Sequence, residues 1–124
     1  MFPIIPAASA ADSGNQEGIF GYGSTPATAV TNLVSNAGVV ATDTTGVGTA
    51  RYGVGACEYG EDKGILGFGN NGGTKYGVTN LVSNTGVVAT DVAAVGTVRT
   101  YIAGCSYGED KGIFGFGQTA GLQQ

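Results

Sequence analysis

The sequence lacks the residue types on which most catalytic and metal sites depend. It contains no His, one Met and two Cys, and only 11% of its residues are charged. Without His, neither a Ser-His-Asp triad nor a Cys-His pair can form, and no CxxC motif or EF-hand pattern offers a metal site. A GxGxxG pattern at Gly67–Gly72 leads into a strand-like run, not a helix, which argues against dinucleotide binding. We therefore expect no enzymatic activity, no cofactor and no metal.

Basic residues are also scarce. Five Lys and Arg stand against nine Asp and Glu, which gives a net charge of -4 and a pI near 4.4. Because nucleic acids and anionic membranes bind clustered basic residues, neither is an expected partner. No apolar run approaches the roughly 20 residues of a membrane-spanning helix, and the N-terminal stretch lacks the basic region of a cleaved signal peptide. The composition alone assigns no compartment.

The two cysteines occupy equivalent places in a repeat, because Cys57 and Cys105 lie 48 residues apart. We expect both to be small buried apolar side chains. A disulfide between them is the alternative, and it would require α-carbons within about 7 Å of each other.

Glycine is the most prominent residue that the chain does contain. There are 24 Gly among 124 residues, and 42% of the chain is hydrophobic. The chain is too rich in glycine for helices and too apolar for disorder. Its length suits one domain, residues 1–124. These features predict an all-β fold of short strands joined by tight turns.

An internal repeat organises the sequence. Thr31–Gly69 and Thr79–Gly117 are identical at 27 of 39 positions without a gap, and a weaker copy, "SGNQEGIFGYG", begins at Ser13. A period of 48 residues is typical of propeller blades or of helical repeats. Frequent glycines and the lack of an i, i+3, i+4, i+7 apolar pattern exclude the helical repeats.

Each repeat contains four strand-like runs. In the central repeat these are "RYGVGACEYG" from Arg51, "KGILGFG" from Lys63, "KYGVTNLV" from Lys75 and "GVVATD" from Gly86. The turn signals "GED", "GNNGG" and "SNTG" separate them. Four antiparallel strands in 40 to 50 residues form one blade of a β-propeller. We expect the glycines to thin the strands so that neighbouring sheets pack closely.

This order resembles the kelch-type blade. An Arg, an inner strand, "KGIFGFG" and then "TNLVSNTGVVATD" follow the kelch pattern, with Val39 or Val87 in place of the kelch Trp and with the double glycine split. The repeats are also similar to kelch-like arrays in virion proteins of marine tailed phages. The resemblance implies a structural protein of a virion or of another extracellular assembly.

The strand count predicts incomplete blades. Residues 1–49 make a first blade with a degenerate inner strand near Ala7–Asp12. Its other strands are expected at about Gly18–Gly23, Thr28–Val34 and Val39–Asp43. Residues 50–98 make a complete blade, residues 99–117 an inner half-blade, and residues 118–124 a tail. About two and a half blades leave open edges. We therefore expect a homo-oligomeric ring, with six blades from a trimer before eight from a tetramer, or a filament built by strand donation.

Repeated charges supply the candidate binding residues. Asp43 and Asp91 each precede an arginine, Arg51 and Arg99, by eight residues. We expect an ion pair or hydrogen-bond network that fixes the loop before each inner strand. The alternative is a site between blades that binds a sugar or a carboxylate. Acidic turns and tyrosines repeat as well. We expect the acids to be solvated turn residues and the tyrosines to be core or rim aromatics; the alternative is a weak cation site or a platform for carbohydrate. These residues are Glu61, Asp62, Glu109, Asp110, Tyr52, Tyr59, Tyr101 and Tyr107.

Two functions of different classes follow from these features. The first is a self-assembling structural protein whose partner is another copy of the chain. The second is a multivalent, lectin-like module that binds a glycan. In the predicted strand "KGIFGFG", Ile113 and the ring of Phe114 or Phe116 lie on opposite faces. The residues expected at the contact between copies are Arg99, Tyr101, Ile113, Phe114 and Phe116.

Overall fold

The computed structural model describes residues 16–119. These residues form seven strands and no helix, and the strands pair into antiparallel sheets. The degenerate strand predicted near residues 7–12 and the last residues, 120–124, lie outside the described part. The prediction of an all-β fold is confirmed.

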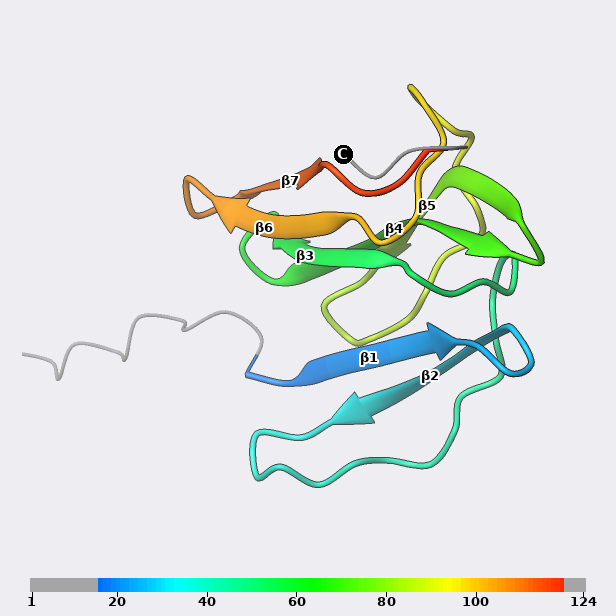
Figure 1. Ribbon diagram of the computed structural model, residues 1–124. Coiled ribbons are helices and arrows are strands. Elements are labelled where there is room, and N and C mark those ends of the chain that lie inside the picture. Colours follow the sequence, from blue (N-terminus) through cyan, green and yellow to red (C-terminus); the bar gives the residue numbers. More distant parts are fainter. Residues whose placement is uncertain (1–15, 120–124) are drawn as a thin grey trace, which may run out of the picture.

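The sheets follow one another along the chain and lie in three layers (Figure 1). The first sheet pairs β1 (Gly18–Gly23) with β2 (Thr28–Val34), which are the bounds that the sequence predicts. The middle sheet has the order β3-β4-β5, and the last sheet pairs β6 with β7. The remaining bounds are β3 Gly55–Tyr59, β4 Lys63–Asn71, β5 Thr74–Val82, β6 Ala103–Tyr107 and β7 Lys111–Gly115.

The inner strands begin later than predicted. The runs that start at Arg51 and Arg99 become strands only at Gly55 and Ala103. Gly53 has a φ of 64°, a left-handed conformation that interrupts extended backbone. Both arginines therefore lie in the connections that precede the strands.

The outer run of each repeat is not a regular strand. The segment that begins at Gly86 meets β5 only at isolated bridges, Val88 with Val82 and Val92 with Thr79. The first repeat has the same arrangement beside β2, with bridges from Val40 to Val34 and from Thr44 to Thr31. The fourth part of each repeat is thus held to its sheet at a few points.

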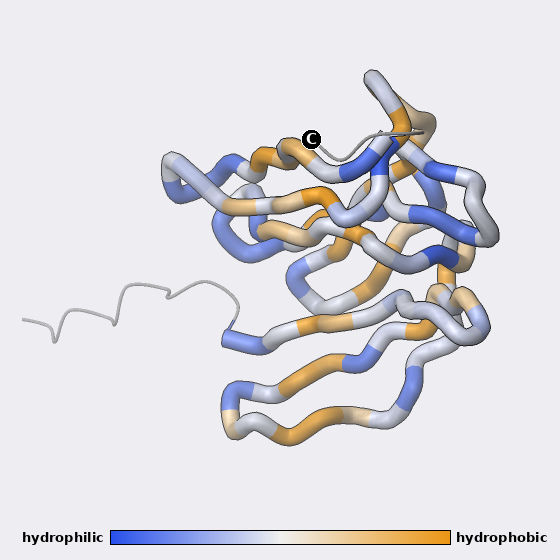
Figure 2. The backbone as a smooth tube through the Cα atoms, in the orientation of Figure 1, coloured by the Kyte–Doolittle hydropathy of each residue, from blue (hydrophilic) through white to orange (hydrophobic). Residues whose placement is uncertain are grey.

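Glycines allow the middle and last sheets to approach closely. A Cβ on Gly104 would lie 2.5 Å from the carbonyl oxygen of Ala56, so no larger residue fits there. Beside it, the rings of Phe68 and Phe114 meet edge to face with centroids 5.7 Å apart. Short apolar stretches alternate with neutral ones along the strands (Figure 2). Few apolar side chains are fully buried among the described residues: Ala29, Leu66, Val82 and Ile102.

The two cysteines differ from the expectation. Both are free; Cys57 is half-buried and Cys105 is exposed. A Cβ on Gly112 of β7 would lie 2.5 Å from the Cys57 Sγ, which places this thiol against the last sheet. Burial raises the pKa of the Cys57 thiol. The prediction that both are buried was wrong, because Cys105 lies on a sheet that no other described residues cover on its outer side.

The aromatic residue of the repeated "GFG" or "GYG" motif has a left-handed backbone. Tyr22, Phe68 and Phe116 have φ values of 62°, 64° and 63°. In β1 and β4 this residue forms a bulge, since the register shifts between the glycines that flank it. The bulge turns the aromatic residue and its carbonyl away from the regular ladder. The repeated "GFG" or "GYG" motif therefore encodes a local geometry as well as close packing.

Candidate functional site

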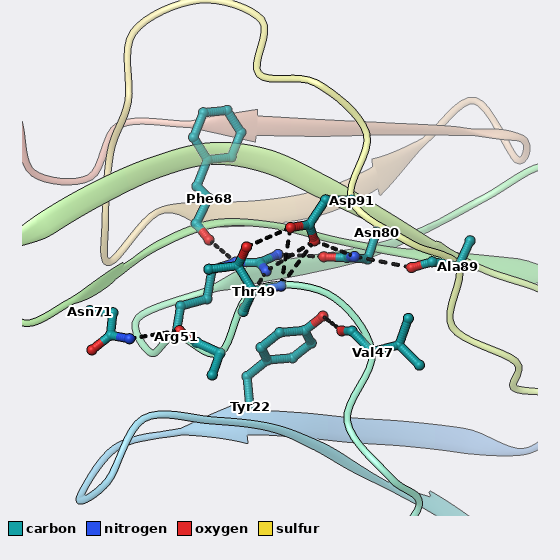
Figure 3. A network of polar contacts seen from close by, with 10 residues as sticks. Tyr22, Val47, Thr49, Arg51, Phe68, Asn71, Asn80, Ala89 and Asp91 are labelled. Carbon is teal, nitrogen blue, oxygen red and sulfur yellow. Dashed lines mark hydrogen bonds and ion pairs between the residues drawn. The ribbon is translucent and has the colours of Figure 1, made fainter.

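The most extensive polar site of the described residues surrounds the Arg51 side chain (Figure 3). Arg51 is completely buried, with 0% of its surface exposed. Its Nε donates to the Phe68 carbonyl oxygen at 2.6 Å, its Nη1 to the Thr49 carbonyl oxygen at 2.9 Å, and its Nη2 to the Asn80 Oδ1 at 2.6 Å. The bulge in β4 presents the first of these acceptors, and β5 presents Asn80. A buried guanidinium requires such acceptors.

Asp91 supplies the negative charge of the site. Its carboxylate accepts hydrogen bonds from the Thr49 Oγ1 at 2.6 Å and the Asn80 Nδ2 at 2.8 Å, and it lies 3.8 Å from the Arg51 Nη1. The Thr49 amide also donates to it, at 3.1 Å. Burial alone would raise the pKa of Asp91, but the donors from Thr49 and Asn80, with Arg51 nearby, lower it below its ordinary value.

Tyr22 of the first sheet covers the arginine. The Arg51 Cζ lies 4.5 Å from the centroid of the Tyr22 ring, a cation-π contact. The Tyr22 hydroxyl donates to the Val47 carbonyl oxygen at 3.0 Å. Burial raises the pKa of this phenol. The site therefore also joins the first sheet to the middle one.

The pairing differs from the one expected from spacing. Arg51 pairs with Asp91 of its own repeat, not with Asp43, which precedes it by eight residues. The reason is that β4 and β5 bring the outer run of a repeat back beside the connection that opens the same repeat. A structural network is present, as the sequence predicts, but its partners come from the whole repeat.

The first repeat contains the same acceptors without an arginine. The Asn32 Nδ2 donates to the Asp43 Oδ1 at 2.9 Å and to the Ala41 carbonyl oxygen at 3.2 Å. The corresponding distances from Asn80 are 2.8 Å and 3.0 Å. Among residues 16–119 no group donates to the Asn32 Oδ1. The first 50 residues contain no Lys or Arg, and Ile5 aligns with Arg51. We call the pair Asn32 and Asp43 the open site.

The last repeat contains the arginine without the acceptors. The Arg99 Nη1 donates to the Phe116 carbonyl oxygen at 3.4 Å, as Arg51 does to Phe68. Within residues 16–119, no Asn or Asp side chain forms a hydrogen bond or an ion pair with the Arg99 side chain. A cleft of about 410 Å³ opens next to Arg99, with Phe116 on its wall. The open site and Arg99 thus correspond to two parts of the network around Arg51: the first repeat has its acceptors, and the last repeat has its arginine.

The acidic turns do not form a site with three or more metal-binding side chains within residues 16–119. Asp62 pairs with Lys63 at 2.9 Å, and Asp110 pairs with Lys111. The Lys63 ammonium and the Asn84 amide lower the pKa of the Asp62 carboxyl. Adjacent turns are joined by a backbone bond of 2.6 Å from the Gly60 amide to the Asp110 carbonyl oxygen. These acids therefore have local structural partners.

Of the four repeated tyrosines, Tyr59 and Tyr107 line one cleft, which Tyr52 and Tyr101 do not line. Tyr52 and Tyr59 are half-buried, whereas Tyr101 and Tyr107 are exposed. The Tyr52 hydroxyl accepts from the Asn70 amide at 3.2 Å. No described segment forms a helix with the length and apolar character needed to cross a membrane.

Sequence reasoning missed the residues that complete the network. Asn80 and Thr49 each accept a hydrogen bond from Arg51 and donate one to Asp91, and Tyr22 covers the guanidinium. A usable signal exists in the repeat: Thr49 and Thr97 each precede an arginine by two residues, and an Asn recurs in the "TNLV" of both copies.

No known family model matches the chain, and no curated protein matches it either.

Proposed function

We propose that this chain is a structural protein that assembles with copies of itself as a kelch-like β-propeller. Support comes from the middle repeat, in which β3, β4, β5 and the segment with bridges at Val88 and Val92 follow one another in antiparallel order. A propeller blade has this order of four strands. The lack of His leaves few routes to catalysis, which favours a structural role.

The observation that carries self-assembly is the exposure of positions that are covered in the middle sheet. Leu66 of β4 is 5% exposed, whereas Phe20, its counterpart in β1, is 52% exposed. On the last sheet Ile113 is 53% exposed, and Phe116, which follows it, is 80% exposed. Exposed apolar side chains and open strand edges favour association. A second copy offers surfaces of the matching kind.

A closed ring of three copies with about six blades is the form that we expect. In such a ring each contact joins the last repeat of one copy to the first repeat of the next. The contact is heterologous, so the same pairing would build a filament if the rotation between copies did not close.

The lectin-like alternative has less support. Arg51 is fully buried, and its three donor nitrogens already have protein acceptors. A sugar would have to displace those acceptors to reach it. Of the two arginines, Arg99 lies beside a cleft, and within residues 16–119 its side chain donates only through Nη1. A glycan screen in which binding is lost in Arg99→Met would favour this alternative.

Native mass spectrometry across a range of protein concentrations tests self-assembly. A species of three chains is the expected result, and an unlimited ladder of masses would indicate a filament. A protein that stays monomeric at the highest attainable concentration contradicts the proposal.

A further inference from the structure

The structure contains a complete arginine network in the middle and its two separate halves at either end. We propose that copies join by strand exchange: the β6–β7 hairpin of one copy takes the place of β1 beside β2 of the next, and Arg99 fills the open site. This inference rests on the self-assembly proposed above and names its contact.

The open site already has the geometry that binds an arginine. Asn32 is held by Asp43 and by the Ala41 carbonyl oxygen at nearly the distances found around Asn80. Its Oδ1 corresponds to the atom that accepts the Arg51 Nη2 at 2.6 Å. The carboxylate of Asp43 stands in a segment of 50 residues without a cation. Both charge and hydrogen-bonding capacity therefore match a guanidinium.

The last repeat presents its arginine in the motif that fills the middle site. Gly48-Thr49-x-Arg51 recurs as Gly96-Thr97-x-Arg99, and both glycines have a φ of 80°. A Cβ on Gly48 would lie 2.2 Å from the Asp91 Oδ1, whereas a Cβ on Gly96 would meet nothing within 4 Å. The loop of the last repeat thus has the required backbone and an empty space where the carboxylate would lie.

The two strands that exchange are nearly identical. β1 reads "GIFGYG", and β7 with the two residues after it reads "GIFGFG". Their bulge residues, Tyr22 and Phe116, have φ values of 62° and 63°. The ladder lost when β1 leaves β2 is regained by β7 in the same register, so the exchange is close to neutral in backbone hydrogen bonds. The arginine contacts are the net gain.

The hairpin stays intact in this exchange. Arg99 keeps its bond to the Phe116 carbonyl oxygen, and Phe114 keeps its contact with Phe68 in the middle sheet. Phe116 would lie over Arg51 of the next copy where Tyr22 lies now. The residues of β7 and Phe116 would therefore take the places that the residues of β1 and Tyr22 hold now.

Two defective variants of the full chain test the contact when they are mixed. Arg99→Met removes the donor, and the double variant Asn32→Ala with Asp43→Ala removes the acceptors. We expect the dissociation constant of each variant alone to rise about a hundredfold. A mixture still contains one intact donor and one intact acceptor, so it should give a one-to-one heterodimer in native mass spectra. Lys75→Met, which removes a positive charge from β5, should assemble as the parent does.

A reversible lock tests the exchange of β1. Ile19 pairs with Leu33, whose carbonyl oxygen accepts from the Ala41 amide on the other side of β2. The pair is therefore not hydrogen-bonded across β1 and β2, and its α-carbons lie about 4.5 Å apart, within disulfide range. In a background of Cys57→Ala and Cys105→Ala, Ile19→Cys with Leu33→Cys should assemble when reduced and remain monomeric when oxidised.

The outcomes separate the two proposals. If the parent assembles and Arg99→Met assembles equally well, the arginine contact is refuted while self-assembly survives. Equal assembly of the oxidised and reduced lock refutes the exchange of β1. A parent that never associates refutes both proposals. Circular dichroism confirms that each variant keeps its sheets.

Discussion

The filled site around Arg51 and the open site in the first repeat share an Asn and an Asp, but among the described residues only the filled site also has an arginine and a threonine. Asn80 and Asn32 make the same two hydrogen bonds, each to an Asp of the outer run and to a backbone carbonyl. The strands and the bridges beside them therefore position the acceptors without help from the arginine. The cation binds to a site that already exists, which means that a cation from another chain can do the same.

The filled site and the separated groups also differ in solvent exposure. Arg51 is fully buried because acceptors surround it, whereas Asp43 is exposed. Charged groups are stable inside a protein only when they are paired and hydrogen-bonded. Each separated half thus remains in contact with solvent until its complement arrives.

The largest expected effect comes from removing the central arginine. Arg51→Met leaves the Asn80 Oδ1 and the carbonyl oxygens of Phe68 and Thr49 without their donor. It also removes the ion-pair partner of Asp91, and together these losses should cost about 3 to 5 kcal/mol of unfolding free energy. Arg99→Met removes the same residue type from the half without acceptors and should cost less than about 1 kcal/mol in the monomer. Urea denaturation at low protein concentration measures both. Equal losses of unfolding free energy in the two variants would show that the acceptors around Arg51 add no stability beyond that of an arginine without them.

Two glycines sharpen the same comparison at the backbone. Gly48 and Gly96 share a φ of 80°, so an Ala at either position is strained. Only Gly48→Ala also drives a methyl group against Asp91 and Asn80. We expect it to cost about 2 kcal/mol more than Gly96→Ala in the monomer. Thermal unfolding of the two variants gives the difference, and similar midpoints would contradict the tight contact at Gly48.

The sequence predicts some of the strands well and the network only in part. The inner strands begin later than predicted, and the outer run of each repeat is not the regular strand that was expected. β1 and β2 match their predicted bounds because glycine and turn residues delimit them. The repeat spacing singles out Asp91 and Arg51 but pairs each arginine with the wrong aspartate. Which aspartate pairs with an arginine depends on which segments lie side by side in the fold. The spacing of residues along the chain does not carry that information. The left-handed φ of Phe68, which aims its carbonyl at Arg51, has no signal in residue type either.

Acid should weaken the filled site through Asp91. The pKa of this carboxyl is lowered in the folded protein, so its contribution is fully present above the unfolded pKa of about 3.9 and is lost as pH falls through the lower folded pKa. Asp91→Asn should cost about 1 to 2 kcal/mol at pH 7. Its loss relative to the parent should shrink in denaturation curves recorded at pH 3 and below. A constant difference across that range would show that the charge of Asp91 does not contribute.

The smallest effect concerns the aromatic residue that covers the arginine. Tyr22→Phe keeps the ring over Arg51 and removes only the hydrogen bond to the Val47 carbonyl oxygen, which should cost about 1 kcal/mol in the monomer. Phe116→Tyr adds a hydroxyl to an exposed ring and should change monomer stability by less than about 0.5 kcal/mol. After strand exchange, however, that hydroxyl would reach Val47 of the next copy. Phe116→Tyr should therefore tighten assembly several-fold in sedimentation equilibrium while leaving monomer unfolding unchanged, and unaltered or weaker assembly would argue against Phe116 taking the place of Tyr22.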